Sequence, residues 1–247
     1  NIYNDALSSY EKGMKEDAIK KFKLALDIDP SKHATYIVLA KFYKEENSMV
    51  ESNEMIDSAL TLDGLAIEDK TELLLIKAEI FKEQENWGQA IIYYEKAFSE
   101  SNNESVAAVL SILEINLMSE NYMKAIEWGE KAMTKRSGID RIYFSHLLYN
   151  IGLAYRGAGS IYYDKAADII NMINEGKNVG LALKTEGLNN LKLSKENFST
   201  ARDYFLDADV EEMEDASPRE KQMKAIIKEI NNVYIPFFEN YNPTLNE

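Results

Sequence analysis

Apolar and polar positions alternate with a helical period along nearly the whole chain. The pattern is clearest in Thr71–Asn102, TELLLIKAEIFKEQENWGQAIIYYEKAFSESN, where two apolar-striped stretches flank the polar Gln84-Glu85-Asn86. Apolar residues spaced three and four apart lie on one helix face, so the stretch predicts two amphipathic helices joined by a short turn. One such hairpin cannot bury its own apolar face, and we therefore expect copies of it to stack.

Small residues recur in step with this pattern. The second helix of the hairpin carries Ala90 and Ala97, and both positions return every 34 to 41 residues along the chain. Small side chains allow two helices to approach closely, so the recurrence predicts repeated helix–helix contacts of one kind. Only Ile173 departs from the small-residue rule. The first position is occupied by Ala18, Ser52, Ala90, Ala125, Ala166 and Ala201, and the second by Ala25, Ala59, Ala97, Ala132, Ile173 and Ala208.

These residues resemble the tetratricopeptide repeat (TPR), a helix-turn-helix of about 34 residues with small residues at positions 20 and 27. Tyr36, Leu39, Ala40 and Tyr43 also match its bulky, Leu, small and Tyr positions. The resemblance implies an all-α, right-handed α-solenoid of about six helical hairpins in a single domain, 1–247. The repeats cover about 1–30, 31–64, 71–102, 104–135, 140–174 and 180–210.

A further helix over about 217–235 is expected to cap the solenoid. Ser217-Pro218 followed by Glu220 is a helix start, with Ser as the N-cap and Pro in the first turn. Pro236 is expected to end this helix, and the aromatic tail after it is expected to fold back on the cap. In the repeat register Asn1 already occupies position 3, so we expect further sequence upstream of it.

The fifth repeat allows two interpretations. Gly157-Ala158-Gly159-Ser160 is either a widened turn between two helices or part of one long helix over 140–174. Each helix-interior Gly costs about 0.5–1 kcal/mol relative to Ala, a penalty that packing can override. No Pro interrupts the segment, and apolar residues keep helical spacing through it, which favours the long helix. Gly176 is placed to end it.

Charge and composition narrow the classes of partner. The net charge of −14 comes from 42 acidic and 28 basic residues, which argues against nucleic acid because phosphate binding needs a basic patch. No run of about 18 apolar residues is present, so no membrane span is expected. The absence of Cys excludes disulfides, zinc–thiolate sites and a Cys nucleophile.

No residue pattern in the chain predicts catalysis, a metal or a cofactor. The two His, His33 and His146, lack acidic partners at ligand spacing and a nearby Ser nucleophile motif. Asp207–Asp215 is rich in acidic residues but lacks the Gly of an EF-hand loop, so we interpret it as a solvated acidic turn. We therefore expect a protein that is not an enzyme.

The TPR resemblance also implies a binding surface. In that family the first helices line a concave groove, and positions 5, 9 and 12 of each repeat share one helix face. A family subset that binds C-terminal carboxylates of chaperones needs Lys and Asn at the first two of these positions, where this chain has Tyr3 and Leu7. The alternative is that these side chains only contact the neighbouring repeat. The positions are Tyr3, Leu7, Tyr10, Ile37, Lys41, Lys44, Leu75, Glu79, Lys82, Leu110, Glu114, Leu117, Tyr149, Leu153 and Arg156.

The groove is thus an apolar strip with mixed charges, suited to an extended peptide or an amphipathic helix. The leading hypothesis is a non-enzymatic scaffold that binds a protein or peptide segment there. The alternative is a ligand- or peptide-sensing regulatory TPR module of a larger protein. The run from Tyr149, with Ile151-Gly152 and then Tyr162-Tyr163, is also similar to exported TPR proteins of Bacteroidetes-type bacteria. That similarity favours a periplasmic or outer-membrane-associated location.

Overall fold

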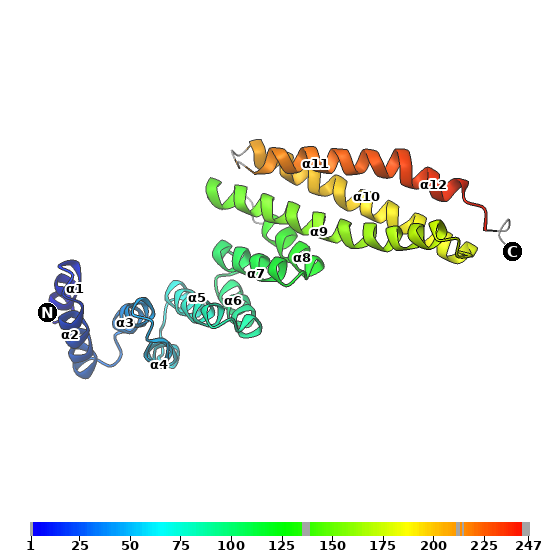
Figure 1. Cartoon of the computed structure of the whole chain (residues 1–247). Coiled ribbons are helices and arrows are strands. Elements are labelled where there is room, and N and C mark those ends of the chain that lie inside the picture. The colour runs from blue at the N-terminus through cyan, green and yellow to red at the C-terminus, as the bar shows by residue number, and fades with distance from the viewer. Residues whose placement is uncertain (1, 135–138, 211–212, 214, 244–247) are drawn as a thin grey trace. The chain divides into compact units, whose positions relative to one another are not determined.

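The computed structural model describes residues 2–134, 139–210, 213 and 215–243, and these residues form helices and no strands (Figure 1). The chain divides into two compact units, which we call unit 1 (residues 1–111) and unit 2 (residues 112–247) and describe separately. Within the described residues, no helix has both the length and the apolarity that crossing a bilayer requires.

Unit 1 consists of three helix pairs and the start of a seventh helix. The pairs are α1 (Ile2–Glu11) with α2 (Lys15–Ile28), α3 (His33–Glu45) with α4 (Met49–Leu60), and α5 (Ile67–Glu83) with α6 (Trp87–Glu100), and α7 spans Val106–Met118.

The turn inside each short helix pair follows one rule. Gly13, Asn47, Glu85 and Glu120 all have positive φ, between 55° and 73°, and each stands five residues before the small residue at repeat position 20. The amide after each of them donates to a carbonyl five residues back, as from Asn86 N to Phe81 O at 2.9 Å. This left-handed residue closes the first helix and reverses the chain.

The recurring small residues are packing positions. Ala18, Ala90, Ala125, Ala166 and Ala201 are all fully buried. The remaining member, Ser52, is equally buried and its hydroxyl donates to Ala40 O at 2.7 Å, which satisfies the polar group inside the hairpin. These side chains therefore set how closely the helices approach and are unavailable to a ligand.

Unit 2 contains the rest of α7, two long helices and several shorter helical elements. These are α8 (Tyr122–Met133), α9 (Arg141–Asn174), α10 (Leu181–Val210) and α11 (Ala216–Glu229), then a π-helical turn, η2 (Ile230–Tyr234), and α12 (Ile235–Asn240). Figure 1 shows α9, α10 and α11 side by side, and they share one core.

Residues 141–174 form one helix, the interpretation that the sequence favours. The Asp140 side chain caps its start by accepting from Ile142 N at 2.9 Å. Its end is closed by Gly176 at φ 74°, with Lys177 N donating to Met172 O at 3.0 Å. The predicted ending at Gly176 is therefore confirmed.

The glycines inside α9 are contact sites for aromatic rings. A Cβ built on Gly152 would lie 2.7 Å from the Phe205 ring, and one on Gly159 would lie 2.8 Å from the Phe198 ring. A Cβ on Gly157 would overlap the ring of Tyr122. Burial of these rings against bare backbone offsets the helix cost of glycine, which is why the Gly-rich segment stays helical.

The prediction of a sixth hairpin over 180–210 is wrong, because Leu181–Val210 forms a single helix, α10. No Pro interrupts the segment, its one glycine, Gly187, lies near its start, and its polar side chains bond to their own helix. Asn197 Nδ2 donates to Leu193 O at 2.8 Å and Thr200 Oγ1 to Glu196 O at 3.1 Å. The second-helix pattern of a hairpin also fits a continuous helix, so spacing alone could not separate them.

The capping helix begins and ends at other residues than the sequence predicted. It begins at Ala216, and Ser217 lies inside it rather than capping it. The helical backbone continues past Pro236 into α12. Proline has no amide hydrogen and its ring crowds the carbonyl of the preceding turn, and the wider π-helical turn η2 just before it makes room for the ring.

The aromatic tail packs against α10 and not back onto the capping helix. Phe238 is fully buried against Gly187, and Lys184 Nζ donates to Tyr241 O at 2.6 Å. Of the acidic segment, residues 207–210 are the last turn of α10, not a loop. Glu211, Glu212 and Glu214 lie outside the described residues, as do Asn1 and the end of the fourth predicted repeat at residue 135.

Candidate functional site

Helices α1 and α3 form a surface cleft of about 260 Å³ in unit 1. Three predicted groove residues, Leu7, Tyr10 and Lys41, line it. Tyr10 is 40% exposed and stands edge-on to Phe42, with ring centroids 4.5 Å apart. The cleft is therefore an apolar, aromatic depression that remains open to solvent. We call it the α1–α3 cleft, and its lining residues are Leu7, Tyr10, Val38, Lys41, Phe42 and Glu45.

The predicted charged groove residues of α3 and α5 face one another. Lys41 Nζ lies 2.5 Å from Glu72 Oε1, and Lys44 pairs with Glu79 and, at 3.4 Å, with Glu83. Burial lowers the pKa of Lys44, but the hydrogen bonds and charges of Glu79 and Glu83 outweigh it and leave that pKa above its usual value. These residues form a charged strip that joins neighbouring repeats.

The other predicted groove residues of unit 1 lie outside the α1–α3 cleft and are buried or only partly exposed. Ile37 is 6% exposed and belongs to a core cluster with Ile56 and Leu73, so it packs and does not face a ligand. The Tyr3 ring contacts Phe22 at 5.5 Å and lies under Lys32 Nζ at 3.9 Å. Three further residues are partly exposed on their helices: Leu75, Lys82 and Leu110.

In unit 2 the predicted residues are divided between α7 and α9. Glu114 is exposed and Leu117 partly exposed on α7. On α9, Tyr149 is nearly buried and Leu153 packs against the core. The sequence missed Arg219 of α11, whose Nε donates to Tyr149 Oη at 2.5 Å.

A second cleft, of about 380 Å³, lies between α8 and α9. Met123 and Ile161 are its most exposed apolar residues, at 66% and 44%. None of its residues is among the predicted groove positions. Its signal was available once 140–174 was taken as one helix, because Ala158, Ile161, Tyr162 and Lys165 then share a face. The lining residues are Glu120, Asn121, Tyr122, Met123, Lys124, Ala158, Ile161, Tyr162 and Lys165.

A carboxylate held by two stacked tyrosines connects three helices of unit 2. Tyr155 and Tyr204 donate to Glu130 Oε1 at 3.2 and 2.7 Å, and their rings stack 5.8 Å apart. Burial first, and then the Glu130 charge, raises the pKa of Tyr155 to about 12, and the same causes raise the pKa of Tyr204. Both phenols therefore stay protonated near neutral pH, which fits a structural tie and not an acid–base pair.

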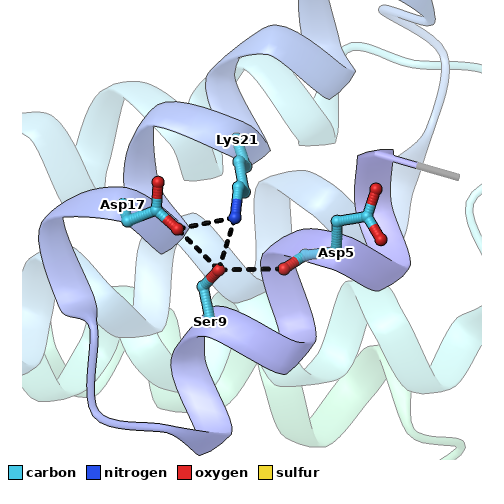
Figure 2. Close-up of polar contacts among 4 residues, drawn as sticks. All are labelled: Asp5, Ser9, Asp17 and Lys21. Atoms are coloured by element: carbon cyan, nitrogen blue, oxygen red, sulfur yellow. Dashed lines mark hydrogen bonds and ion pairs between the residues drawn. The ribbon is translucent and has the colours of Figure 1, made fainter.

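A serine, a lysine and an aspartate meet between α1 and α2 (Figure 2). Lys21 Nζ donates to Ser9 Oγ at 2.7 Å and to Asp17 Oδ2 at 2.6 Å. A serine nucleophile with a lysine base would need an exposed hydroxyl and an uncharged amine. Ser9 is only 2% exposed, and an ammonium paired with a carboxylate cannot take the serine proton. Bonds from Lys21 and Ser9 also lower the pKa of Asp17, so the trio joins two helices.

Comparison with protein-family models and with curated proteins gives no match. Solved structures do match. The MamA protein is 22% identical with a TM-score of 0.52, over 82% of this chain and 93% of that one. A tetratricopeptide repeat protein from Parabacteroides merdae is 18% identical with a TM-score of 0.50, over 94% and 98%. A TPR-repeat protein from Bacteroides fragilis is 14% identical with a TM-score of 0.52, over 92% and 97%.

The chain has a TPR-like fold. The expected all-α solenoid class is thereby confirmed, although unit 2 replaces its last hairpins with single long helices. In the TPR register Leu7 and Tyr10 are positions 9 and 12 of the first repeat, and Lys41 is position 9 of the second. The α1–α3 cleft adds Val38, Phe42 and Glu45, which stand next to groove positions along α3 and which the three-position rule omits.

Proposed function

We propose that the chain is a non-enzymatic protein-interaction scaffold that binds a peptide segment at the α1–α3 cleft. The observation that carries the proposal is the convergence of Leu7, Tyr10 and Lys41 on one surface depression. These residues come from two repeats and share the groove positions of a TPR-like fold. A surface that two successive repeats build together is where such a fold presents a ligand site.

The chemistry of the cleft defines the peptide. Leu7 and Val38 offer apolar contact beside the nearly buried Phe42, and the exposed Tyr10 offers both a ring face and a hydroxyl. We therefore propose an apolar or aromatic anchor residue in the cleft. The chain's net charge of −14 favours basic residues beside that anchor.

The charged strip of α3 and α5 sets the path of the peptide beyond the anchor. Lys41 and Lys44 already have carboxylate partners on α5, so their positive charges are neutralised within the chain. We propose that the bound segment runs along this strip toward Leu75 and makes polar contacts at its rim. Rim contacts of this kind contribute specificity more than affinity.

A peptide selection tests the proposal. Phage-displayed random peptides would be selected on the whole chain, and the dissociation constant of an enriched peptide would then be measured by fluorescence anisotropy. We expect Leu7→Arg to weaken binding about tenfold or more, because it places a charge in the apolar cleft. Leu75→Arg combined with Leu110→Arg should weaken it less.

The matched control is Ile28→Arg. Ile28 is an apolar residue of unit 1 that is already 65% exposed, at the end of α2 and outside the cleft lining. Binding should survive this change. Equal affinity in Leu7→Arg and Ile28→Arg, with far-UV circular dichroism showing both folded, would reject the cleft as the binding surface.

A further inference from the structure

Arg219 of unit 2 lies against one tyrosine, and a second arginine stands on the same helix as that tyrosine. Arg219, in the first turn of α11, donates from Nε to Tyr149 Oη at 2.5 Å, and its guanidinium carbon lies 5.5 Å from the centre of the Tyr149 ring. These two contacts fix the direction of the guanidinium group. Because Tyr149 accepts this bond, its own hydroxyl proton remains available to a further acceptor.

Arg156 adds a second guanidinium from α9. It follows Tyr149 by seven residues, so both side chains project from the same face of that helix. Burial first, and then the positive charge of Arg219, lowers the pKa of Arg156, while Tyr122 and Tyr149 act in the opposite sense. The two cations are therefore close enough to repel each other in a partly desolvated position.

No carboxylate of the described residues pairs with Arg156 or Arg219. Arg202, on α10, shows the usual arrangement, with Nη2 2.6 Å from Asp203 Oδ1. The chain has 42 acidic residues against 28 basic ones, so an unneutralised arginine pair runs against its overall charge. Two adjacent cations without a counter-charge are unfavourable unless an anion joins them.

We propose that Arg156, Arg219 and the Tyr149 hydroxyl form a binding site for a dianionic oxyanion group. Guanidinium forks match the oxygens of phosphate and carboxylate groups, and two of them balance two negative charges. A phosphate monoester and a dicarboxylate share this chemistry. The site lies on α9 and α11 of unit 2, apart from the α1–α3 cleft of unit 1, and does not depend on the peptide function proposed for that cleft.

Isothermal titration of the whole chain with inorganic phosphate, and separately with succinate, tests the site at constant ionic strength in chloride. We expect saturable binding of one anion per chain. Arg156→Gln should raise its dissociation constant about tenfold or more, because a charge-assisted contact is lost. Arg202→Gln removes the same charge from a paired arginine of unit 2 and should leave binding unchanged. Tighter binding of phosphate would indicate a phosphate monoester as the ligand, and tighter binding of succinate a dicarboxylate.

Thermal unfolding gives a second readout that needs no binding constant. In chloride alone, Arg156→Gln should raise the melting temperature, because it removes the repulsion, whereas Arg202→Gln should not. Phosphate or succinate should raise the melting temperature of the unaltered chain more than that of Arg156→Gln. Absence of binding by both anions would overturn the proposal, and so would equal weakening in Arg156→Gln and Arg202→Gln, which indicates general charge attraction only.

Discussion

Units 1 and 2 both have buried apolar cores, but they differ in the contacts that supplement those cores. In unit 1, neighbouring repeats are joined by ion pairs across helices, such as Lys15 with Glu46 at 2.5 Å and Lys41 with Glu72. In unit 2, aromatic rings pack onto helix backbones at glycines, as Phe205 does at Gly152. Three ion pairs of unit 2 are local instead: Lys177–Glu175, Arg202–Asp203 and Lys224–Glu220.

The difference shows how repeat length and packing are linked. Short hairpins expose many helix ends and leave charged side chains free to bridge to the next repeat. The helices α9 and α10, of 34 and 30 residues, instead run along each other and must stay close over many turns. Glycines at the ring contacts allow that approach. Unit 1 thus keeps the α1–α3 cleft on its surface, while the long helices of unit 2 share one apolar core that includes Phe198, Phe205 and Phe238.

The largest effect is expected from removing a ring of unit 2. Phe205→Ala deletes a fully buried ring that packs on Gly152, and should cost about 3–5 kcal/mol of unfolding free energy. Urea denaturation gives the magnitude, and hydrogen exchange should show protection lost in α9 and α10 while α3 and α5 keep theirs. Equal loss of protection in α3 would contradict the division into two units.

A matched pair of glycine substitutions tests the packing contrast. Gly152→Ala should destabilise by about 1–3 kcal/mol, because its new methyl group meets a ring that cannot move. Gly88→Ala, in α6 of unit 1, meets nothing within 4 Å and should be neutral or stabilise by up to about 1 kcal/mol. Urea denaturation of both variants gives the comparison, and a stabilising Gly152→Ala would refute the backbone contact.

The tyrosine tie of unit 2 predicts a specific sensitivity to high pH. The folded-state pKa of Tyr155, about 12, lies above the value of about 10 in an unfolded chain. Its contribution is therefore complete below about pH 10 and is lost as pH rises toward 12, because the unfolded state releases the proton first. Tyr155→Phe should cost about 1 kcal/mol at neutral pH and flatten the decline, as measured by urea denaturation between pH 8 and about 11.5.

The smallest effect is expected from the charged strip of unit 1. Lys44→Gln breaks the pairs with Glu79 and Glu83 and should cost less than about 1 kcal/mol, because these side chains are partly solvated. The loss should shrink as sodium chloride is raised, since salt screens the charges. A loss of the same size at high salt would mean that Lys44 stabilises the repeat by packing.

The sequence predicted the features that depend on local pattern. Ala18, Ala90 and Ala125 recur in register and are all buried, and the long helix α9 follows from unbroken periodicity. The left-handed turn residues could not be predicted from residue type, because Asn47, Glu85 and Glu120 adopt positive φ without being glycine. The left-handed conformation of these residues results from the packing of the two helices that each turn joins, and the turn residue itself does not indicate it.

The rest depends on contacts between segments far apart in the chain. The roles of Gly152 and Gly157 require knowing that Phe205 and Tyr122 pack onto them. The hydrogen bond between Arg219 and Tyr149 joins residues 70 positions apart, and no sequence motif predicts it. For the groove, the TPR resemblance selected Leu7, Tyr10 and Lys41, but it could not separate them from the buried Ile37, because burial depends on the neighbouring helix.

Photo-crosslinking locates the bound peptide, which we place at the α1–α3 cleft of unit 1. A peptide from the phage selection would carry benzoylphenylalanine at its anchor position, and the crosslinked chain would be mapped by mass spectrometry. We expect adducts in α1 and α3, around Tyr10 and Val38. Adducts confined to the cleft between α8 and α9, or no more than a scrambled peptide gives, would contradict it.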